Sequence, residues 1–287
     1  MYRILFISCG IFVLVAFGFL LKSGSYPNIP IQSNFVVDAN NGETVFYASG
    51  CLSCHSSVGS DNKFALGGGE AFDTAFGTFY APNISMSSKY GIGNWGFDDF
   101  YTALKNGKSP SNENYFPVFP YSSYSNMRDQ DIVDLWGYWQ TLPAVDTPNK
   151  KHDIGFPFNI RKTVSFWNFL YAESAKFSTI DDRSTYLVEA LGHCTQCHTP
   201  RNFLGGLKTE QWFKGAVNPS GKGKIPSIHP SDLQWSKEEI AEYLSSGFTP
   251  EYDVAGGKMA VVIENTSKLS EADRTHIAEY LMRLNDD

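Results

Sequence analysis

The sequence predicts an all-α protein in which one N-terminal transmembrane helix precedes two tandem, similar helical domains. Three observations indicate this fold class. An apolar run opens the chain, a Cys-x-x-Cys-His motif occurs twice, and similar helical patterns surround each copy of the motif. The chain of 287 residues is long enough for two domains. We place them at residues 36–145 and 183–287, with an inter-domain strap at residues 146–182 packed across both. A helix lying on the membrane surface is the alternative for this segment.

Residues 1–25 are interpreted as a membrane anchor. The run from Ile4 to Leu21 is just long enough to cross a bilayer as a helix, and Arg3 and Lys22 flank it. No small-x-small cleavage site follows, so we expect an uncleaved anchor, with a cleaved signal peptide as the alternative. Arg3 should remain in the cytoplasm, which predicts a single-pass protein of the bacterial cytoplasmic (inner) membrane with soluble domains in the periplasm. Cys9 lies within the run and is interpreted as a membrane-buried residue without a chemical role, with lipid attachment as the alternative.

The charge of the chain argues against nucleic acid as a partner. The formal net charge is −7 with a pI near 5.4, and the sequence has no basic patch to neutralise phosphates. An acidic surface would steer a cationic protein partner, although a surface kept acidic for solubility explains the same composition.

The cysteines carry the chemistry. Apart from Cys9, all of them lie in two motifs, Cys51-Leu52-Ser53-Cys54-His55 and Cys194-Thr195-Gln196-Cys197-His198. Cys-x-x-Cys followed directly by His is the attachment signature of c-type haem. Two thiols on one helical turn can reach the two vinyl groups of a porphyrin, and the adjacent His then supplies a ligand to the iron. We therefore expect two covalently bound haem c groups, each with an iron.

Other readings of the motifs explain less. A zinc site built from two Cys-x-x-Cys pairs gives no reason for a His after the second Cys in both copies. A thioredoxin-like redox pair would follow a strand and begin a helix, and no such pattern is present. Two structural disulfides are also possible in an exported chain.

An internal repeat extends beyond the motifs. Each unit begins with a short helix before its motif, and each is expected to contain two later helices. The first unit has Phe97–Lys105, stopping at Gly107, and Asp129–Thr141. The second unit has Ser236–Leu244, stopping at Gly247, and Ser270–Leu284, where Ser270 and Asp273 form a capping box.

A haem iron held by one His needs a second axial ligand to act as a rigid electron carrier, and in cytochromes c this ligand is usually Met. We predict Met259, in a loop before the last helix, for the second domain. For the first domain we predict Met127, which precedes the last helix, with Met86 as the alternative. His152 and His229 are weaker candidates in either domain.

Two prolines are also candidates for the haem environment. Pro82 and Pro226 occupy similar places downstream of the two motifs. A backbone carbonyl there would accept a hydrogen bond from the second nitrogen of the axial His, which fixes the ring and tunes the iron. The alternative is that each proline only shapes a turn and has no contact with the His.

The chain resembles the cytochrome c subunits of bacterial membrane-bound alcohol and gluconate dehydrogenases, over nearly all of residues 36–287. The segments that carry the resemblance are Ala81–Ser85, Gly91–Trp95, Phe119–Met127, Gly192–Asn202, Gly247–Pro250, Gly257–Met259 and Asn265–Leu269. The resemblance implies two class I cytochrome c domains, with His55 and Met127, and His198 and Met259, as axial pairs. Many such subunits carry three haem motifs, whereas this chain has two.

The function expected from these features is electron relay within a respiratory chain, without bond-making catalysis. A periplasmic dehydrogenase would reduce one haem, the second haem would pass the electron on, and quinone or a terminal oxidase would accept it. One alternative is a free-standing donor to a terminal oxidase. Another is a dihaem enzyme, such as a peroxidase or a thiosulfate-oxidising cytochrome, which would need an open iron or a cysteine ligand.

Overall fold

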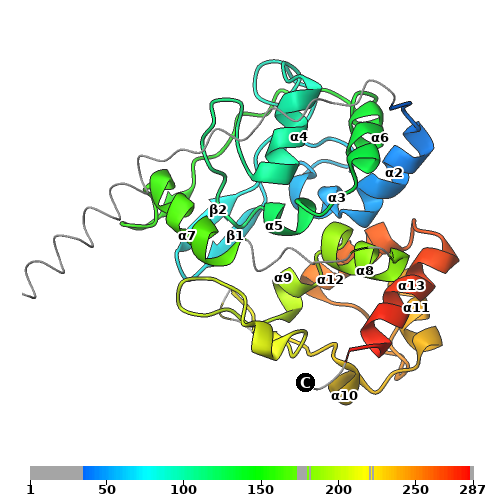
Figure 1. Cartoon of the computed structure of the whole chain (residues 1–287). Helices are drawn as coiled ribbons and strands as arrows, with labels where there is room; N and C mark the ends of the chain where they lie inside the picture. The colour runs from blue at the N-terminus through cyan, green and yellow to red at the C-terminus, as the bar shows by residue number, and fades with distance from the viewer. Residues whose placement is uncertain (1–34, 173–179, 181, 220, 222, 285–287) are drawn as a thin grey trace, which may run out of the picture.

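Two helical lobes stack against each other in the computed structural model, which describes residues 35–172, 180, 182–219, 221 and 223–284 (Figure 1). The first lobe contains α2 (Ala39–Ala48), α3 (Cys51–His55), α4 (Phe97–Asn106), α5 (Tyr121–Tyr124) and α6 (Asp129–Trp139). The second contains α8 (Arg183–Thr185), the π-helix η2 (Tyr186–Leu191), α9 (Thr195–His198), the 3-10 turn η3 (Thr209–Gln211), α10 (Pro230–Leu233), α11 (Lys237–Ser246), α12 (Gly257–Thr266) and α13 (Glu271–Met282). Between them run the 3-10 turn η1 (Arg161–Thr163) and α7 (Val164–Tyr171).

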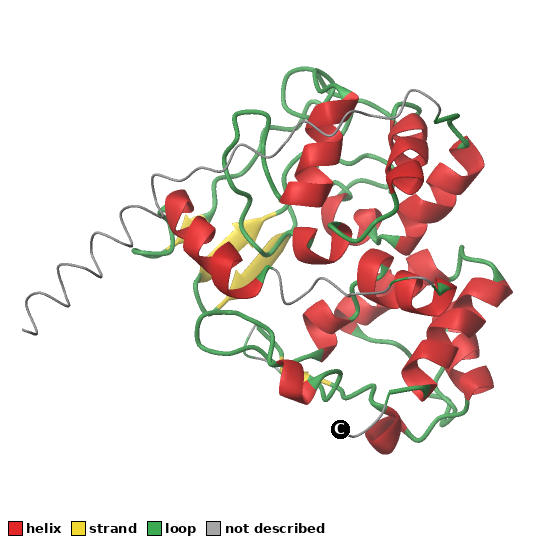
Figure 2. Ribbon diagram, viewed as in Figure 1, coloured by secondary structure: helices red, strands yellow, loops and turns green. Residues whose placement is uncertain are grey.

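Small antiparallel sheets lie beside the helices, as Figure 2 shows. The larger sheet has the order β1 (Ala71–Thr74), β2 (Gly77–Tyr80) and β3 (Asp153–Ile154), and the smaller pairs β4 (Ala216–Val217) with β5 (Lys224–Ile225). In the larger sheet Ala71 faces Tyr80 and Thr78 faces Asp153. The prediction of an all-α fold was therefore wrong, because the chain mixes helix and sheet. Strands of two to four residues are too short to give a readable alternation of polar and apolar side chains.

The predicted membrane topology also needs correction. No helix in the described part of the chain combines the length and the apolar character needed to cross a bilayer. This finding contradicts the expected single-pass membrane protein. Residues 1–25, where the anchor was predicted, lie outside the described residues.

Most helix boundaries follow the capping signals in the sequence. α4 ends at Gly107 and α11 at Gly247, and both glycines adopt the left-handed conformation, with φ of 60° and 79°. Ser236 caps α11 in a complete capping box. At α13 only half of the predicted box forms: the Ser270 hydroxyl accepts from the Asp273 N–H.

One hydrophobic core runs through both lobes. It includes residues of α2 and α6 in the first lobe and of η2, α11 and α13 in the second. Polar contacts cross the same boundary: the Tyr186 hydroxyl donates to Asp131 and accepts from the Arg128 N–H at 3.0 Å. The two units therefore pack as a continuous body, and the placement of one haem motif constrains that of the other.

The strap contacts both lobes. On the first lobe, Asn168 accepts from the Tyr121 hydroxyl at 2.5 Å, and β3 of the strap pairs with β2. On the second lobe, the Trp167 indole donates to the Leu204 carbonyl at 3.0 Å. Helix α7 thus contacts α5 of the first lobe and the loop that follows the second haem motif.

An ion pair fixes the start of the segment that leads into the second motif. Arg183 donates from two nitrogens to the carboxylate of Asp273, both at 2.8 Å, and the Asp273 side chain is only 12% exposed. We expect Arg183→Ala to lower the free energy of unfolding by about 2 kcal/mol, because Asp273 keeps a partly buried charge without its partner. Arg283→Ala is the matched control. Its pair with Asp182 is about half exposed, so the loss should stay below about 1 kcal/mol. Urea denaturation of the haem-loaded protein measures both, and equal losses would contradict the expectation.

Candidate functional site

Each predicted haem motif occupies a single helical turn. Cys51, Cys54 and His55 lie on α3, whereas Cys194 is the N-cap of α9, which also carries Cys197 and ends at His198. One turn of helix brings the two thiols of a motif to the same side and places the His directly after them. This local structure is the same in both lobes, as expected for a repeated unit.

The two motif histidines make the same backbone contact. Nδ1 of His55 lies 2.8 Å from the Pro82 carbonyl oxygen, and Nδ1 of His198 lies 2.9 Å from the Pro226 carbonyl oxygen. A carbonyl can only accept, so Nδ1 carries the hydrogen and Nε2 keeps its lone pair. Burial lowers the pKa of His55 to about 4 and also lowers the pKa of His198, so both rings are neutral near pH 7. Each ring is thus prepared to ligate a metal through Nε2.

A glycine packs closely against each of these His–Pro contacts. Gly68 donates its N–H to the His55 carbonyl at 2.9 Å, and a Cβ on Gly68 would lie 2.5 Å from the Pro82 oxygen. Gly215 donates to the His198 carbonyl at 2.8 Å, and its Cβ would lie 2.9 Å from the carbonyl carbon of Pro226. Both glycines have positive φ, 69° and 80°. Neither glycine was among the site residues predicted from the sequence.

The motif thiols are not reactive thiolates. Burial raises the pKa of Cys51 to about 12, that of Cys54 to about 11 and that of Cys194 to about 12, and it also raises the pKa of Cys197. None of the four is in a disulfide. The described residues also hold no group of three or more His, Cys, Asp or Glu side chains arranged for a metal ion.

The predicted second ligands lie in different settings. Met127 is 1% exposed and directly precedes α6. Met259 is half-buried on the first turn of α12, not in the loop that the sequence predicted. Among the alternatives, Met86 is half-buried, Nδ1 of His152 accepts from the Tyr80 N–H, and Nδ1 of His229 contacts the Ser231 hydroxyl.

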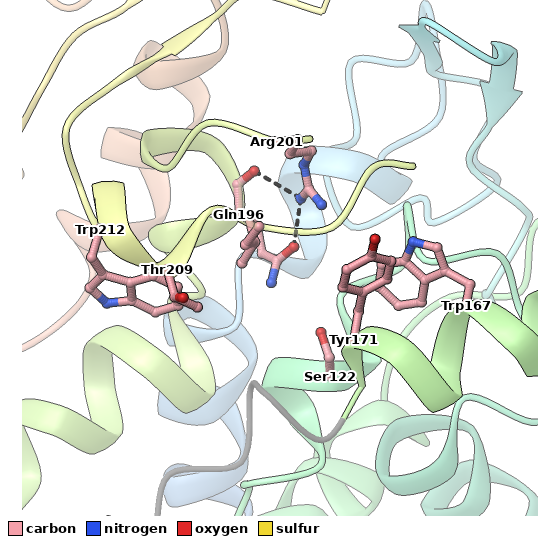
Figure 3. A pocket seen from close by; sticks show the side chains of 8 residues that line it. Ser122, Trp167, Tyr171, Gln196, Arg201, Thr209 and Trp212 are labelled. Atoms are coloured by element: carbon pink, nitrogen blue, oxygen red, sulfur yellow. Dashed lines mark hydrogen bonds between the residues drawn. The ribbon is translucent and has the colours of Figure 1, made fainter. Parts of the chain in front are cut away.

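A hollow beside the second motif is lined with aromatic rings (Figure 3). Trp167 and Tyr171 reach it from α7, and Trp212 and Arg201 reach it from the second lobe. The Arg201 guanidinium holds Gln196, between the two motif cysteines, through the Gln196 carbonyl at 3.0 Å and its side-chain oxygen at 2.7 Å. Neutral thiols that solvent can still reach, an Nε2 lone pair on each motif His and nearby aromatic rings are the donor set and surface that a covalently bound porphyrin requires. The residues present therefore fit haem c.

The two motifs approach each other through residues that the sequence prediction did not single out. The rings of Tyr124 and His193 pack edge to face, with centroids 5.4 Å apart. Tyr124 donates to the Ser49 carbonyl at 2.7 Å, and burial together with the Cys51 and Cys54 thiols raises its pKa. His193 directly precedes Cys194. Its position next to the motif was the one signal in the sequence that could have identified His193 as part of the site.

Glu189 is a buried acid in the second lobe. Its carboxylate is 1% exposed and accepts from the Trp212 indole at 3.0 Å and from the Tyr280 hydroxyl. Burial raises its pKa from 4.5 to about 7, so the folded state holds this proton more tightly than the unfolded chain. The free energy of unfolding should therefore fall as pH rises from about 4.5 to about 7.

Glu189→Gln should remove this pH dependence and gain about 2–3 kcal/mol of stability at pH 8 relative to the parent protein. Urea denaturation of the haem-loaded protein at a series of pH values measures the slope. Glu238→Gln, at an exposed position in the first turn of α11, is the control and should keep the parent's slope. A Glu189→Gln slope equal to the parent's would assign the pH dependence to other groups.

Comparison with known proteins identifies the family. No protein-family model matches the chain. A dihaem cytochrome c-type protein of Cereibacter sphaeroides is 46% identical over 254 residues, which are 86% of this chain and 86% of that protein. The chain belongs to the dihaem cytochromes c. It therefore carries covalently bound haem c and is an electron-transfer protein rather than a catalytic subunit.

Other relatives of this dihaem cytochrome c are parts of larger enzymes. The fructose dehydrogenase cytochrome subunit of Gluconobacter japonicus is 33% identical, and the match covers 84% of this chain and 51% of that subunit. The gluconate 2-dehydrogenase cytochrome c subunit of Pantoea cypripedii is 30% identical, with 85% and 58% covered. The resemblance to dehydrogenase cytochrome c subunits is thus confirmed, although the chain spans only about half the length of these subunits.

Proposed function

We propose that this dihaem cytochrome c holds one haem in each lobe and relays electrons from a dehydrogenase toward quinone or a terminal oxidase. Residues 36–145 and 183–287 would form the two haem units, with residues 146–182 as the strap between them. Cys51 and Cys54 would hold the first haem and Cys194 and Cys197 the second. The single observation that carries the proposal is the repeated contact of a motif His with a proline carbonyl.

The bound haem supplies one-electron chemistry, and the chain supplies the setting. His55 and His198 would ligate the irons through Nε2, while the carbonyls of Pro82 and Pro226 fix the ring orientation and increase the electron density on each imidazole. In the second unit Met259 is the proposed second ligand, which raises the reduction potential. The shared core keeps the two motifs at a fixed separation, which an intramolecular relay requires.

The dehydrogenase partner is proposed from the relatives, whose names describe subunits of fructose, gluconate and alcohol dehydrogenases. The test is to purify the chain from its own host and to add fructose, gluconate or a primary alcohol to the oxidised protein. Haem reduction that depends on one substrate supports a dehydrogenase subunit. Reduction by none of them, together with rapid oxidation by a terminal oxidase, would favour the free-standing donor.

A further inference from the structure

The loops that follow α4 and α11 make the same backbone contacts in the two haem units. The Tyr115 N–H donates to the Gly107 carbonyl at 2.7 Å, and the Ala255 N–H donates to the Gly247 carbonyl at 2.8 Å. Isolated bridges pair residue 108 with 114 and residue 248 with 254. The loops correspond at a constant offset of 140 residues, and both helices end in a left-handed glycine.

Carried four residues past the last matched contact, the offset of 140 residues pairs a phenylalanine with a methionine. Four residues beyond the matched bond, the second unit has Met259 and the first has Phe119. Met259 lies on the first turn of α12 and packs against the common core. Phe119 packs against the same core, with its ring centroid 5.7 Å from that of Tyr124, the residue that borders the first motif.

Met127 has a different counterpart. It directly precedes Arg128, the N-cap of α6, just as Leu269 directly precedes Ser270, the N-cap of α13. Both side chains are buried, at 1% and 5% exposure, and both belong to the common core. The residue before the N-cap of the last helix is therefore a buried core residue in both units.

We infer that the two irons differ in coordination: Met259 ligates the second iron, whereas Phe119 leaves the first iron an open sixth position for a small exogenous ligand such as carbon monoxide or cyanide. The inference rests on the proposed attachment of one haem to each motif. A phenyl ring has no donor atom, and Met127 is used to fill the core, as its equivalent Leu269 does. The sequence prediction chose Met127 by its position before the last helix, so the two assignments make opposite predictions.

The test uses the full-length haem-loaded chain and four proteins: the parent, Met259→Leu, Met127→Leu and Phe119→Met. A pyridine haemochrome count comes first. The ferric near-infrared spectrum then reports Met–iron charge-transfer bands, and titration of the ferrous protein reports carbon monoxide uptake. Met127→Leu nearly conserves side-chain volume and copies the residue of the second unit, so its fold should be retained.

For the parent we expect the band intensity of one Met-ligated haem and uptake of one carbon monoxide per chain. Met259→Leu should lose the band and double the uptake. Met127→Leu should match the parent in both measurements. Phe119→Met should double the band and abolish the uptake, a gain of ligation that misfolding cannot produce.

Two results would overturn the inference. One is a parent protein whose charge-transfer band has the intensity of two Met-ligated haems and loses half of that intensity in Met127→Leu. The other is a parent protein that takes up no carbon monoxide although it carries two haems. A chain that carries haem only at the second motif would overturn both this inference and the proposed attachment, and the haem count identifies that case separately.

Discussion

Replacing Cys194 and Cys197 together with serine is expected to halve the covalent haem content of the protein. The two thiols lie on one turn at the start of α9, and serine cannot form the thioether bonds that hold a haem c. The first motif keeps its own cysteines, so one covalent haem should remain. Electron relay through the second unit should be lost with its haem.

The haem content is measured as pyridine haemochrome per chain, after acid extraction of haem that is not covalently bound. Cys51→Ser with Cys54→Ser is the reciprocal variant and should leave the haem of the second unit. Cys9→Ser is the control, because Cys9 belongs to neither motif, and it should retain full content. Full haem content in either double variant would show that the motif thiols are not the attachment points.

The chemistry of the site could be read from the sequence because it depends on residues that are adjacent in the chain. Cys-x-x-Cys-His places its three groups on one turn whatever surrounds it, and the structure has one turn at both motifs. Helix ends such as Gly107 and Gly247 were predictable for the same reason, since a left-handed glycine cap is a local signal.

Features that depend on distant contacts were not predictable. Gly215 is required because the Pro226 carbonyl carbon approaches it, a contact that only the folded chain creates. The strand β3 exists because residues 153 and 154 return to β2 from far along the chain. Met259 was placed in a loop because Gly256 and Gly257 precede it, although packing against the core allows α12 to begin at Gly257.

The internal repeat also carried more information than the motif search used. Sequence order favoured Met127 because it stands before the last predicted helix of its unit. The hydrogen-bond register of the two loops, which only the structure provides, extends to residues 115 and 255 and is the basis for our inference that Phe119 corresponds to Met259. A repeat is therefore most informative where its two copies differ.

Gly68→Ala and Gly215→Ala are expected to cause the largest loss of stability among single substitutions at the haem sites. Each adds a Cβ less than 3 Å from the proline carbonyl group that accepts from the motif His, and each forces a side chain into positive φ. Left-handed backbone costs about 1–2 kcal/mol for a residue with a Cβ, and overpacking adds about 1–3 kcal/mol. We expect a total loss of about 2–5 kcal/mol in the free energy of unfolding.

Gly59→Ala separates the two contributions, because Gly59 has a φ of 79° but no atom within 4 Å of the added Cβ. It should show the backbone cost alone, about 1–2 kcal/mol. The clash should also move the proline carbonyl away from Nδ1 of His55 or His198, which weakens the hydrogen bond that enriches the ring in electrons. The reduction potential of the affected haem should therefore rise in Gly68→Ala and Gly215→Ala and stay unchanged in Gly59→Ala. The potentials are measured by spectroelectrochemistry. If they do not differ among these proteins, Gly68 and Gly215 contribute to folding alone and do not tune the iron.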